Sequence, residues 1–288
     1  MTAVLLALTS ALCYGLSDFV GGIVSRRTSA WKVAVVGQLS ATGCTAAVAL
    51  LVPGRPDGGD FVWALLAGVA SGTGTGFLYR GFASGRMSVV APVSAVGAAV
   101  VPVLVGSLGG ERLSALVWTG IVCALPGIWL VSSAPSEPDL LDEAGGRPRR
   151  GSVAEGVTDG VLAGLGFGVL FAALGQIPDG AGLWPLTLAQ AVSVPTVVLL
   201  AVAVRAAWVP RERASWWALL AGPLGASATG AFLLASQSGY LTIAGVLSSL
   251  YPATTVLLAA VVLRERIHRG QGLGLGLCAV AVALVAGG

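Results

Sequence analysis

Few residues in this chain are able to do chemistry, and most of them lie within long apolar stretches. Asp18 is the only carboxylate well inside such a stretch, and Tyr14 precedes it by four residues, which places both on one face of a helix. A charge buried in a membrane costs about 2.5–3.5 kcal/mol on insertion scales, so it usually faces a protein interior or water. Asp18 could therefore bind an amine or carry a proton, and it could equally be an interfacial carboxylate paired with Arg26 or Arg80.

Two amides and one arginine extend this polar set. Gln38 and Gln190 lie in the middle of other apolar stretches, where an amide needs a hydrogen-bonding partner or a cavity, so substrate contact and helix–helix hydrogen bonding are both open. Arg80 could bind an anionic group, but extension of its side chain to the interface is favoured. The serines of the set are expected mainly to pack. The candidate substrate-binding residues are Tyr14, Asp18, Gln38, Arg80, Ser94, Phe167, Phe171, Gln190, Ser248 and Tyr251.

The same inventory argues against other functions. A membrane-embedded enzyme would need several His, Asp, Glu or Cys side chains at a common depth, and the chain has one histidine, His268, at the edge of an apolar stretch. No GxxxxGK[ST] phosphate loop is present. The net charge of +3 is too small and dispersed to predict nucleic-acid binding. We therefore expect no catalytic residues, no metal, no cofactor and no enzymatic activity.

Membrane-spanning helices must position these residues. Hydrophobic residues make up 56% of the 288 and charged residues only 10%, and the mean hydropathy is +0.89, outside the range of soluble domains. A membrane helix needs about 20 apolar residues. The sequence predicts an all-α integral membrane protein with ten transmembrane helices, near residues 3–24, 33–52, 61–79, 87–108, 115–133, 158–175, 184–204, 216–235, 242–263 and 271–287.

The ten predicted helices fall into two related halves. The hexapeptide WALLAG at residues 63–68 recurs at residues 217–222, an offset of 154 that also relates Glu111-Arg112 to Glu265-Arg266. With a one-residue shift, Tyr14-Gly15 corresponds to Phe167-Gly168. Such a register predicts an internal duplication. Because each unit has five helices, an odd number, the second unit enters the membrane from the opposite side, which makes the repeats inverted.

The longest polar stretch and the basic residues give the domain boundaries and the orientation. Residues 134–157 are predicted to form a cytoplasmic linker between a first repeat at 1–133 and a second at 158–288. Fourteen of the 16 Lys and Arg residues lie in loops that follow odd-numbered helices. The positive-inside rule then places these loops in the cytoplasm and both termini outside, in a multi-pass protein of the cell membrane.

Two motifs resemble a known family. Residues 91–102, followed by Glu111-Arg112, resemble the end of one unit of the EamA family in the drug/metabolite transporter superfamily. Residues 250–256, followed by Glu265-Arg266, resemble the same signature in the second unit. The markers are a proline in the fourth helix of each unit and a Glu-Arg pair just beyond it. Neither Pro92 nor Pro102 lies 154 residues before Pro252, so we expect the two fourth helices to bend differently.

This resemblance implies a solute carrier with a central cavity between its halves. We expect a secondary transporter that moves a small metabolite, an amino acid or a similar solute, in the export direction by alternating access. An uptake carrier for a sugar or another small molecule is the alternative, and a non-transporting membrane-embedded enzyme is less favoured. The expected partners are a small solute, the lipid bilayer and, through Asp18, protons. Glu111, Arg112, Glu265 and Arg266 are expected to have structural and topological roles at the membrane edges.

Overall fold

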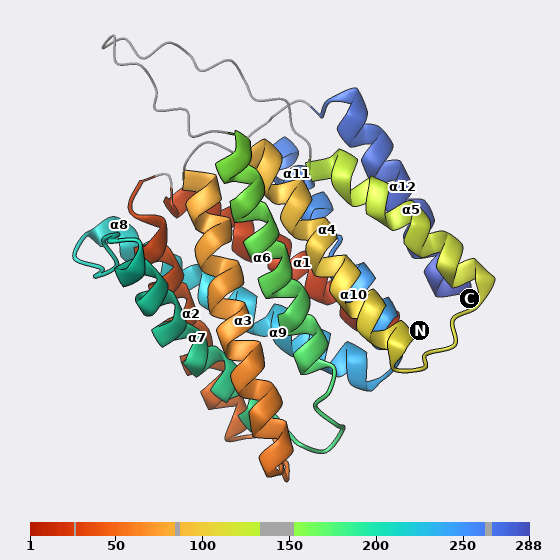
Figure 1. Ribbon diagram of the computed structural model, residues 1–288, viewed down its shortest axis with the longest axis horizontal. Coiled ribbons are helices and arrows are strands. Elements are labelled where there is room, and N and C mark those ends of the chain that lie inside the picture. The colour runs from red at the N-terminus through yellow and green to blue at the C-terminus, as the bar shows by residue number, and fades with distance from the viewer. Residues whose placement is uncertain (26, 84–86, 133–152, 263–266) are drawn as a thin grey trace.

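The computed structural model describes residues 1–25, 27–83, 87–132, 153–262 and 267–288, and these residues form helices without any strand (Figure 1). Ten segments are long and apolar enough to cross a membrane, which confirms the predicted number of spans. The first half contains α1 (Thr2–Ser25), α2 (Ala30–Ala49), α3 (Gly58–Ala83), α4 (Met87–Leu108) and α5 (Ala115–Ser132). Linker residues 134–152 and the sequence-predicted Arg26, Glu265 and Arg266 lie outside the described ranges.

The second half contains the same five spans with two interruptions. Its helices are α6 (Val153–Leu174), α7 (Trp184–Ala203), α8 (Arg213–Trp216), α9 (Ala221–Gln237), α10 (Leu241–Ser248), α11 (Tyr251–Val262) and α12 (Arg269–Gly287). A 3-10 turn, Trp217–Leu220, joins α8 to α9 into one span. The helices α10 and α11 together form another span.

The start of α6 corrects the predicted linker boundary. This helix begins at Val153, whereas the linker was expected to extend to residue 157. Glu155, Thr158 and Asp159 make its first two turns polar, so the apolar run starts later than the helix does. Backbone hydrogen bonding continues a helix regardless of side-chain polarity, and hydropathy alone therefore misplaces this end.

The helix boundaries confirm the duplication. The first and last residues of α7 lie 154 residues after the first and last residues of α2. The same offset relates both ends of α4 to both ends of the span formed by α10 and α11. The starts of α5 and α12 and the ends of α3 and α9 differ by the same 154 residues. The register that the sequence shows between residues 63 and 120 therefore extends over four of the five helix pairs.

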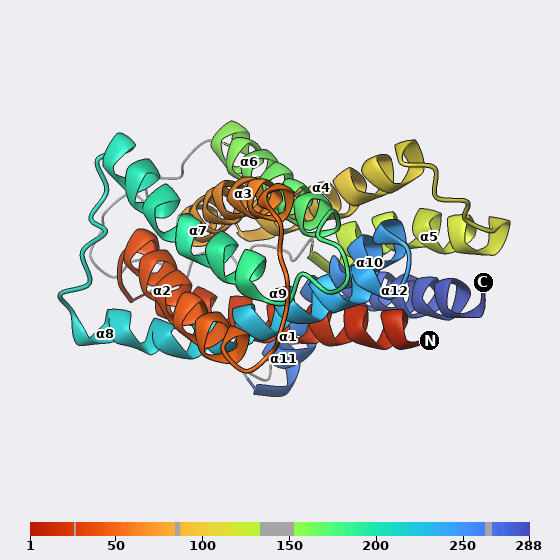
Figure 2. The same ribbon diagram turned by 90° about the horizontal axis from the view of Figure 1, so that it is seen from below.

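The two halves are interleaved rather than set side by side. In the first half, α3 packs against α6 and α7, and in the second half the corresponding α9 packs against α1 and α2. Three corresponding pairs, α2 with α7, α4 with α10 and α5 with α12, pack against each other. Figure 2 shows α3, α4 and α6 on one side of the bundle and α1 and α9 on the other. This reciprocal pattern is that of an approximate two-fold axis between inverted repeats.

Glycines allow the close approach of corresponding helices. A Cβ atom placed on Gly15 in α1 would lie 2.8 Å from the backbone oxygen of Tyr251, and one placed on Gly168 in α6 would lie 2.9 Å from that of Gly97. Tyr251 and Gly97 are themselves 154 residues apart. The same contact thus recurs in both halves, which confirms that Gly15 corresponds to Gly168 with the one-residue shift.

The fourth helices of the two halves differ in the way that their prolines predict. The helix α4 is continuous through Pro92 and Pro102, whereas the corresponding span of the second half breaks between Ser248 and Tyr251. Pro252 has no N–H to donate and its ring crowds the carbonyl four residues earlier, which ends α10 at this point. The break places Tyr251 at the first position of α11, in the middle of the membrane span.

The loop after α4 holds a carboxylate against the start of α10. Glu111 accepts hydrogen bonds from the backbone N–H groups of Leu241, at 2.6 Å, and Thr242, at 3.1 Å. A carboxylate at a helix N-terminus satisfies backbone donors and interacts favourably with the helix dipole. The neighbouring Arg112 is exposed. Glu111 therefore ties the first half to the second at this edge of the bundle.

This contact predicts a measurable loss of stability. Glu111→Ala should lower the free energy of unfolding by about 1 kcal/mol, since two N–H groups of α10 lose their acceptor. Glu111→Gln should cost less, because its amide oxygen still accepts one bond. The thermal midpoint of the purified protein in detergent measures both, with Arg112→Ala as the control at an exposed neighbour. Equal midpoints for Glu111→Ala and Arg112→Ala would show that the cap contributes nothing.

Candidate functional site

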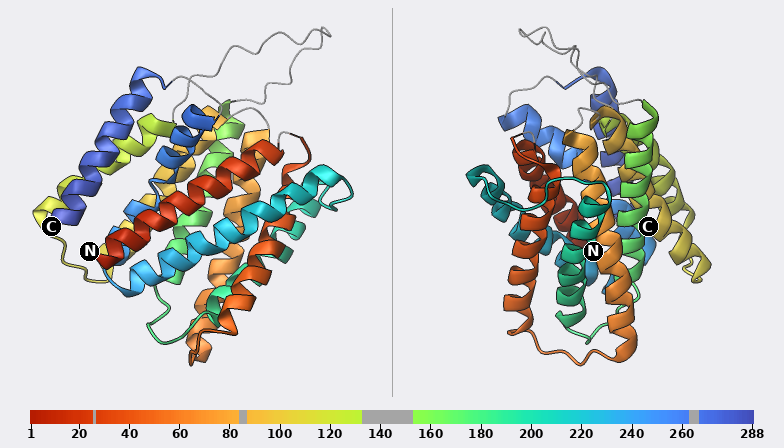
Figure 3. Two further views of the ribbon diagram at one scale, coloured as in Figure 1. Left: turned by 180° about the vertical axis from the view of Figure 1, so that it is seen from behind. Right: turned by 60° about the vertical axis from the view of Figure 1, so that its left-hand side comes forward.

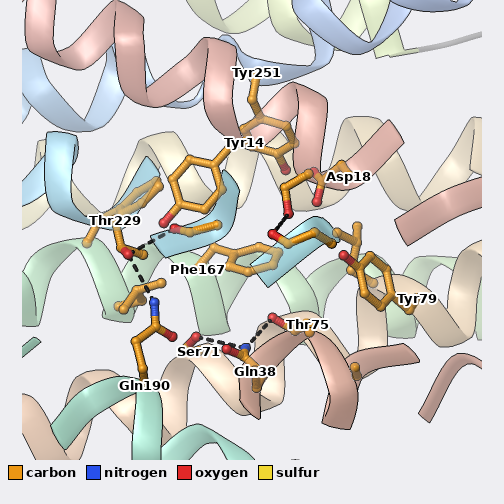
Figure 4. A pocket seen from close by; sticks show the side chains of 18 residues that line it. Tyr14, Asp18, Gln38, Ser71, Thr75, Tyr79, Phe167, Gln190, Thr229 and Tyr251 are labelled. Carbon is orange, nitrogen blue, oxygen red and sulfur yellow. Dashed lines mark hydrogen bonds between the residues drawn. The ribbon is translucent and has the colours of Figure 1, made fainter. Parts of the chain in front are cut away.

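A cavity lies between the two halves, and helices of both halves line it (Figure 4). Its volume is about 60 Å³, enough for several water molecules. Seven of the ten sequence-predicted substrate-binding residues line it: Tyr14, Asp18, Gln38, Phe167, Phe171, Gln190 and Tyr251. The other lining residues are Ser17, Ala34, Gly37, Ser71, Thr75, Leu78, Tyr79, Leu170, Ala221, Gly225 and Thr229.

Asp18 is the charged group of this cavity. Its carboxylate makes no hydrogen bond or ion pair with any residue that the structure describes, so the expected alternative of a pair with Arg80 is wrong. The hydroxyl of Tyr14 is also buried without a hydrogen-bonding partner among the described residues, and the hydroxyl of Tyr251 has only that of Ser94 as a neighbouring hydrogen-bonding group. Asp18 interacts electrostatically with both tyrosines. Buried polar atoms are normally satisfied, so these three groups beside one cavity indicate a site for a bound molecule.

The two glutamines make equivalent hydrogen bonds in the two halves. Gln38 donates from Nε2 to the hydroxyl of Thr75 at 3.1 Å, and Gln190 donates to the hydroxyl of Thr229 at 3.0 Å (Figure 4). The two threonines are 154 residues apart, whereas the glutamines are 152 residues apart. Gln38 also donates to Ser71 at 3.3 Å. Each glutamine therefore joins two neighbouring helices and also faces the cavity. Helix–helix hydrogen bonding and substrate contact, the two roles that the sequence left open, do not exclude each other.

Aromatic rings form one side of the cavity. Phe171 stacks on Phe232 with ring centroids 4.3 Å apart, and Tyr14 meets the Phe171 ring edge-on at 5.7 Å. The ring centroids of Tyr251 and Tyr14 are 6.2 Å apart. Phe167 and Phe171 occupy the positions in α6 that correspond to Tyr14 and Asp18 in α1. The duplicated site thus has a polar wall from one half and an apolar wall from the other.

Arg80 lies outside the cavity. Its Nε donates to Oδ1 of Asp159 at 2.9 Å, its Nη2 forms an ion pair with the same oxygen, and its guanidinium lies 4.5 Å above the Phe77 ring centroid. The extension of this side chain to the interface stays a prediction, since Arg80 lies in the last turn of α3 and its side chain is 34% exposed. Asp159 is 1% exposed and lies within α6, so Asp18 is not the only carboxylate inside a helix. In the sequence, Asp159 is the second residue of the apolar run predicted near residues 158–175, and neither the hydropathy nor the 154-residue offset indicates that it contacts Arg80.

The two serines of the predicted set also lie outside the cavity. Ser94 is fully buried and donates to the backbone oxygen of Ala91 at 3.1 Å, and Ser248 donates to that of Ala7 at 3.4 Å. Both contacts are compatible with the packing role expected for them.

Three polar lining residues on α3 were missed. Ser71, Thr75 and Tyr79 follow one another at four-residue spacing and so share a helix face. Periodic polar residues in an apolar helix are a signal that could have identified them from the sequence.

Comparisons with known proteins match this architecture. The model of the EamA-like transporter family matches residues 1–133 and 155–287. No curated protein matches the chain. Twenty-one chains of solved structures match it. One of these, described only as "Crystal structure of protein", has a TM-score of 0.70 and 16% sequence identity over 98% of this chain and 95% of its own, a likeness that shows a common fold.

Proposed function

Because the chain belongs to the EamA-like transporter family, whose members are multi-pass membrane transporters, we propose that it is a secondary transporter that moves a small metabolite through the cavity between its halves. The observation that carries this proposal is the position of the Asp18, Tyr14 and Tyr251 side chains in a cavity formed by both halves, where Asp18 and Tyr14 have no partner among the residues that the structure describes. Ionisable groups inside a membrane bundle commonly mark substrate or ion pathways. Inverted repeats commonly bind substrate at the repeat interface.

Alternating access requires contacts between the halves that can open. Among the described residues, two ion pairs join them, Arg80 with Asp159 and Lys32 with Glu212, and the latter has an Nζ to Oε1 distance of 2.6 Å. Both pairs lie at the face that carries the loops after α1, α3 and α7. Hydrogen bonds from Lys32 and Thr28 hold the pKa of Glu212 below its usual value, so this carboxylate stays charged in mildly acidic solution. These pairs would separate when the face opens and form again when it closes.

The orientation follows from the basic loops. This face carries the excess of Lys and Arg, so it is the cytoplasmic face and both termini lie outside the cell membrane. The two chain ends lie toward the same end of the bundle in Figure 3, and an even number of spans requires them to be on the same side of the membrane. Export of the metabolite is the expected direction, and Asp18 is the candidate group for coupling transport to protons.

A substitution inside the cavity tests the proposal. Gly225 lines the cavity, and a Cβ atom placed there would meet only Ser17 Oγ, at 3.6 Å. Gly225→Leu should therefore fill the cavity with little disturbance of the helices and reduce transport to background. Uptake and efflux of a metabolite panel by proteoliposomes, with and without a pH gradient, measure this effect.

The matched control is Gly43→Leu. Gly43 is exposed on α2 and has no atom within 4 Å of its Cβ position, so this variant should transport as the unchanged protein does. Equal transport by both variants would show that solute does not pass through this cavity. Transport of no solute by the unchanged protein would contradict the proposed function itself.

A further inference from the structure

The charges around the cavity differ from those that an amino acid would need. Among the described residues that line it, Asp18 is the only Asp, Glu, Lys, Arg or His. A zwitterionic amino acid brings an ammonium group and a carboxylate into the same space. Its ammonium could meet Asp18, but its carboxylate would find no cation in the lining. An unpaired charge in a membrane interior is costly, so this carboxylate would weaken binding.

Arg80 does not supply the missing cation. Its guanidinium is occupied by Asp159 and by the ring of Phe77, and it is not among the lining residues. The Asp159 side chain is 2% exposed, so its charge depends on interactions within the protein. Moving Arg80 into the cavity would take a cation away from this buried carboxylate, which is strongly unfavourable. The ion pair outside the cavity therefore keeps the cavity negative.

The unpartnered polar atoms match an ammonium group. An ammonium group has three N–H donors and no acceptor, and carboxylate and phenol oxygens can accept from it. Asp18 and the hydroxyl of Tyr14 have no partner among the described residues, and the hydroxyl of Tyr251 has only that of Ser94 nearby. Asp18 interacts electrostatically with both tyrosines. Figure 4 shows the three side chains along one side of the cavity, with the hydroxyl of Tyr251 turned toward Asp18 and that of Tyr14 turned toward Thr229. The tyrosine rings add faces that attract a cation.

The rest of the lining suits an apolar body with no second charge. Phe167, Leu170 and Phe171 of α6 add an apolar surface that includes the ring that Tyr14 meets edge-on. The amide groups of Gln38 and Gln190 already donate to Thr75 and Thr229. Building on the proposed transport through this cavity, we infer that its substrate is a small monovalent organic cation, an amine with an apolar body, and that the cavity disfavours the corresponding amino acid. One carboxylate balances one positive charge, and the apolar wall covers the remainder of the molecule.

Matched pairs of compounds that differ only by a carboxylate test this inference. The probes are phenethylamine with phenylalanine and isobutylamine with valine, titrated into the full-length protein in lipid nanodiscs and followed by calorimetry. We expect each amine to bind about 30-fold more tightly than its parent amino acid, the ratio that corresponds to about 2 kcal/mol for an unpaired buried charge. Asp18→Asn should weaken amine binding by a similar factor and leave the weak binding of the amino acid nearly unchanged.

Asp179→Asn is the matched control, because Asp179 is exposed in the loop between α6 and α7. It should bind both compounds as the unchanged protein does, and Tyr251→Phe should weaken amine binding less than Asp18→Asn. Equal or tighter binding of the amino acids, amine binding that survives Asp18→Asn, or no amine binding at millimolar concentration would each overturn the inference. Transport of amino acids without amine preference would leave the proposed transport intact. Amine binding that depends on Asp18 without any flux would contradict transport instead.

Discussion

Gly166→Leu is expected to prevent the two halves from packing and to remove most of the folded protein. A Cβ atom at Gly166 in α6 would lie 2.6 Å from the backbone nitrogen and 2.7 Å from the Cα atom of Gly74 in α3. Both obstacles are backbone atoms, so no side chain can rotate away, and the helices themselves must separate. Overpacking a close interior contact costs about 1–3 kcal/mol, and a leucine against backbone should reach or exceed the upper end.

The measurement is the folded yield and thermal midpoint after purification in detergent. Gly276→Leu on α12 is the control, because nothing lies within 4 Å of its Cβ position and the new side chain would extend into open space. The exposed Leu165, next to Gly166, shows that α6 tolerates leucine where it does not meet α3. Gly166→Leu protein with a normal yield and midpoint would mean that α3 and α6 are not in backbone contact.

Arg80→Ala is expected to have the second largest effect, a loss of about 3 kcal/mol in the free energy of unfolding. Removing one partner of a buried ion pair typically costs 3–5 kcal/mol, because the remaining charge stays buried with less compensation. Asp159 is the buried member, since its side chain is 2% exposed against 34% for Arg80. Asp159 keeps other interactions, so the lower end of that range is expected.

Two further variants separate charge from geometry. Arg80→Lys keeps the positive charge but cannot place two nitrogens on one oxygen or lie flat on Phe77, so it should recover only part of the loss. Asp159→Asn should cost less than Arg80→Ala, because a partly exposed arginine can reach water. Chemical unfolding in mixed micelles measures the free energy of unfolding of Arg80→Ala, Arg80→Lys and Asp159→Asn. The reverse order, with Asp159→Asn the more harmful, would show that Arg80 rather than Asp159 is the charge that needs compensation.

The ion pair between Arg80 and Asp159 also has a functional consequence. It joins α3 to α6 across the two halves, and it removes a cation from a space that contains Asp18. The same contact therefore contributes to stability, to closure of one face and to the charge of the cavity. The positions that correspond to Arg80 and Asp159 in the other halves are Leu234 and Leu6, so the approximate two-fold symmetry of the helices does not extend to this ion pair.

The sequence by itself determined the membrane architecture and seven of the 18 residues that line the cavity. Ten apolar runs and an offset of 154 depend on composition and on letter-by-letter repetition, and both are local properties of the chain. Asp18, Gln38 and Gln190 were identifiable because a polar group inside an apolar helix is unfavourable unless it faces a cavity or a partner. The bend at Pro252 was identifiable because a missing backbone donor acts at its own position.

Only the tertiary structure decided the partners of these residues. Arg80 and Asp159 are 79 residues apart, and Glu111 and Leu241 are 130 apart, so each pair depends on how helices of different halves lie across one another. A membrane helix is apolar on all sides, and its hydropathy therefore does not show which face meets another helix. The close passage of Gly166 past Gly74 fixes that choice for α6 and α3. That packing places Asp159 against Arg80 and leaves Asp18 in the cavity without a cation among the described residues around it.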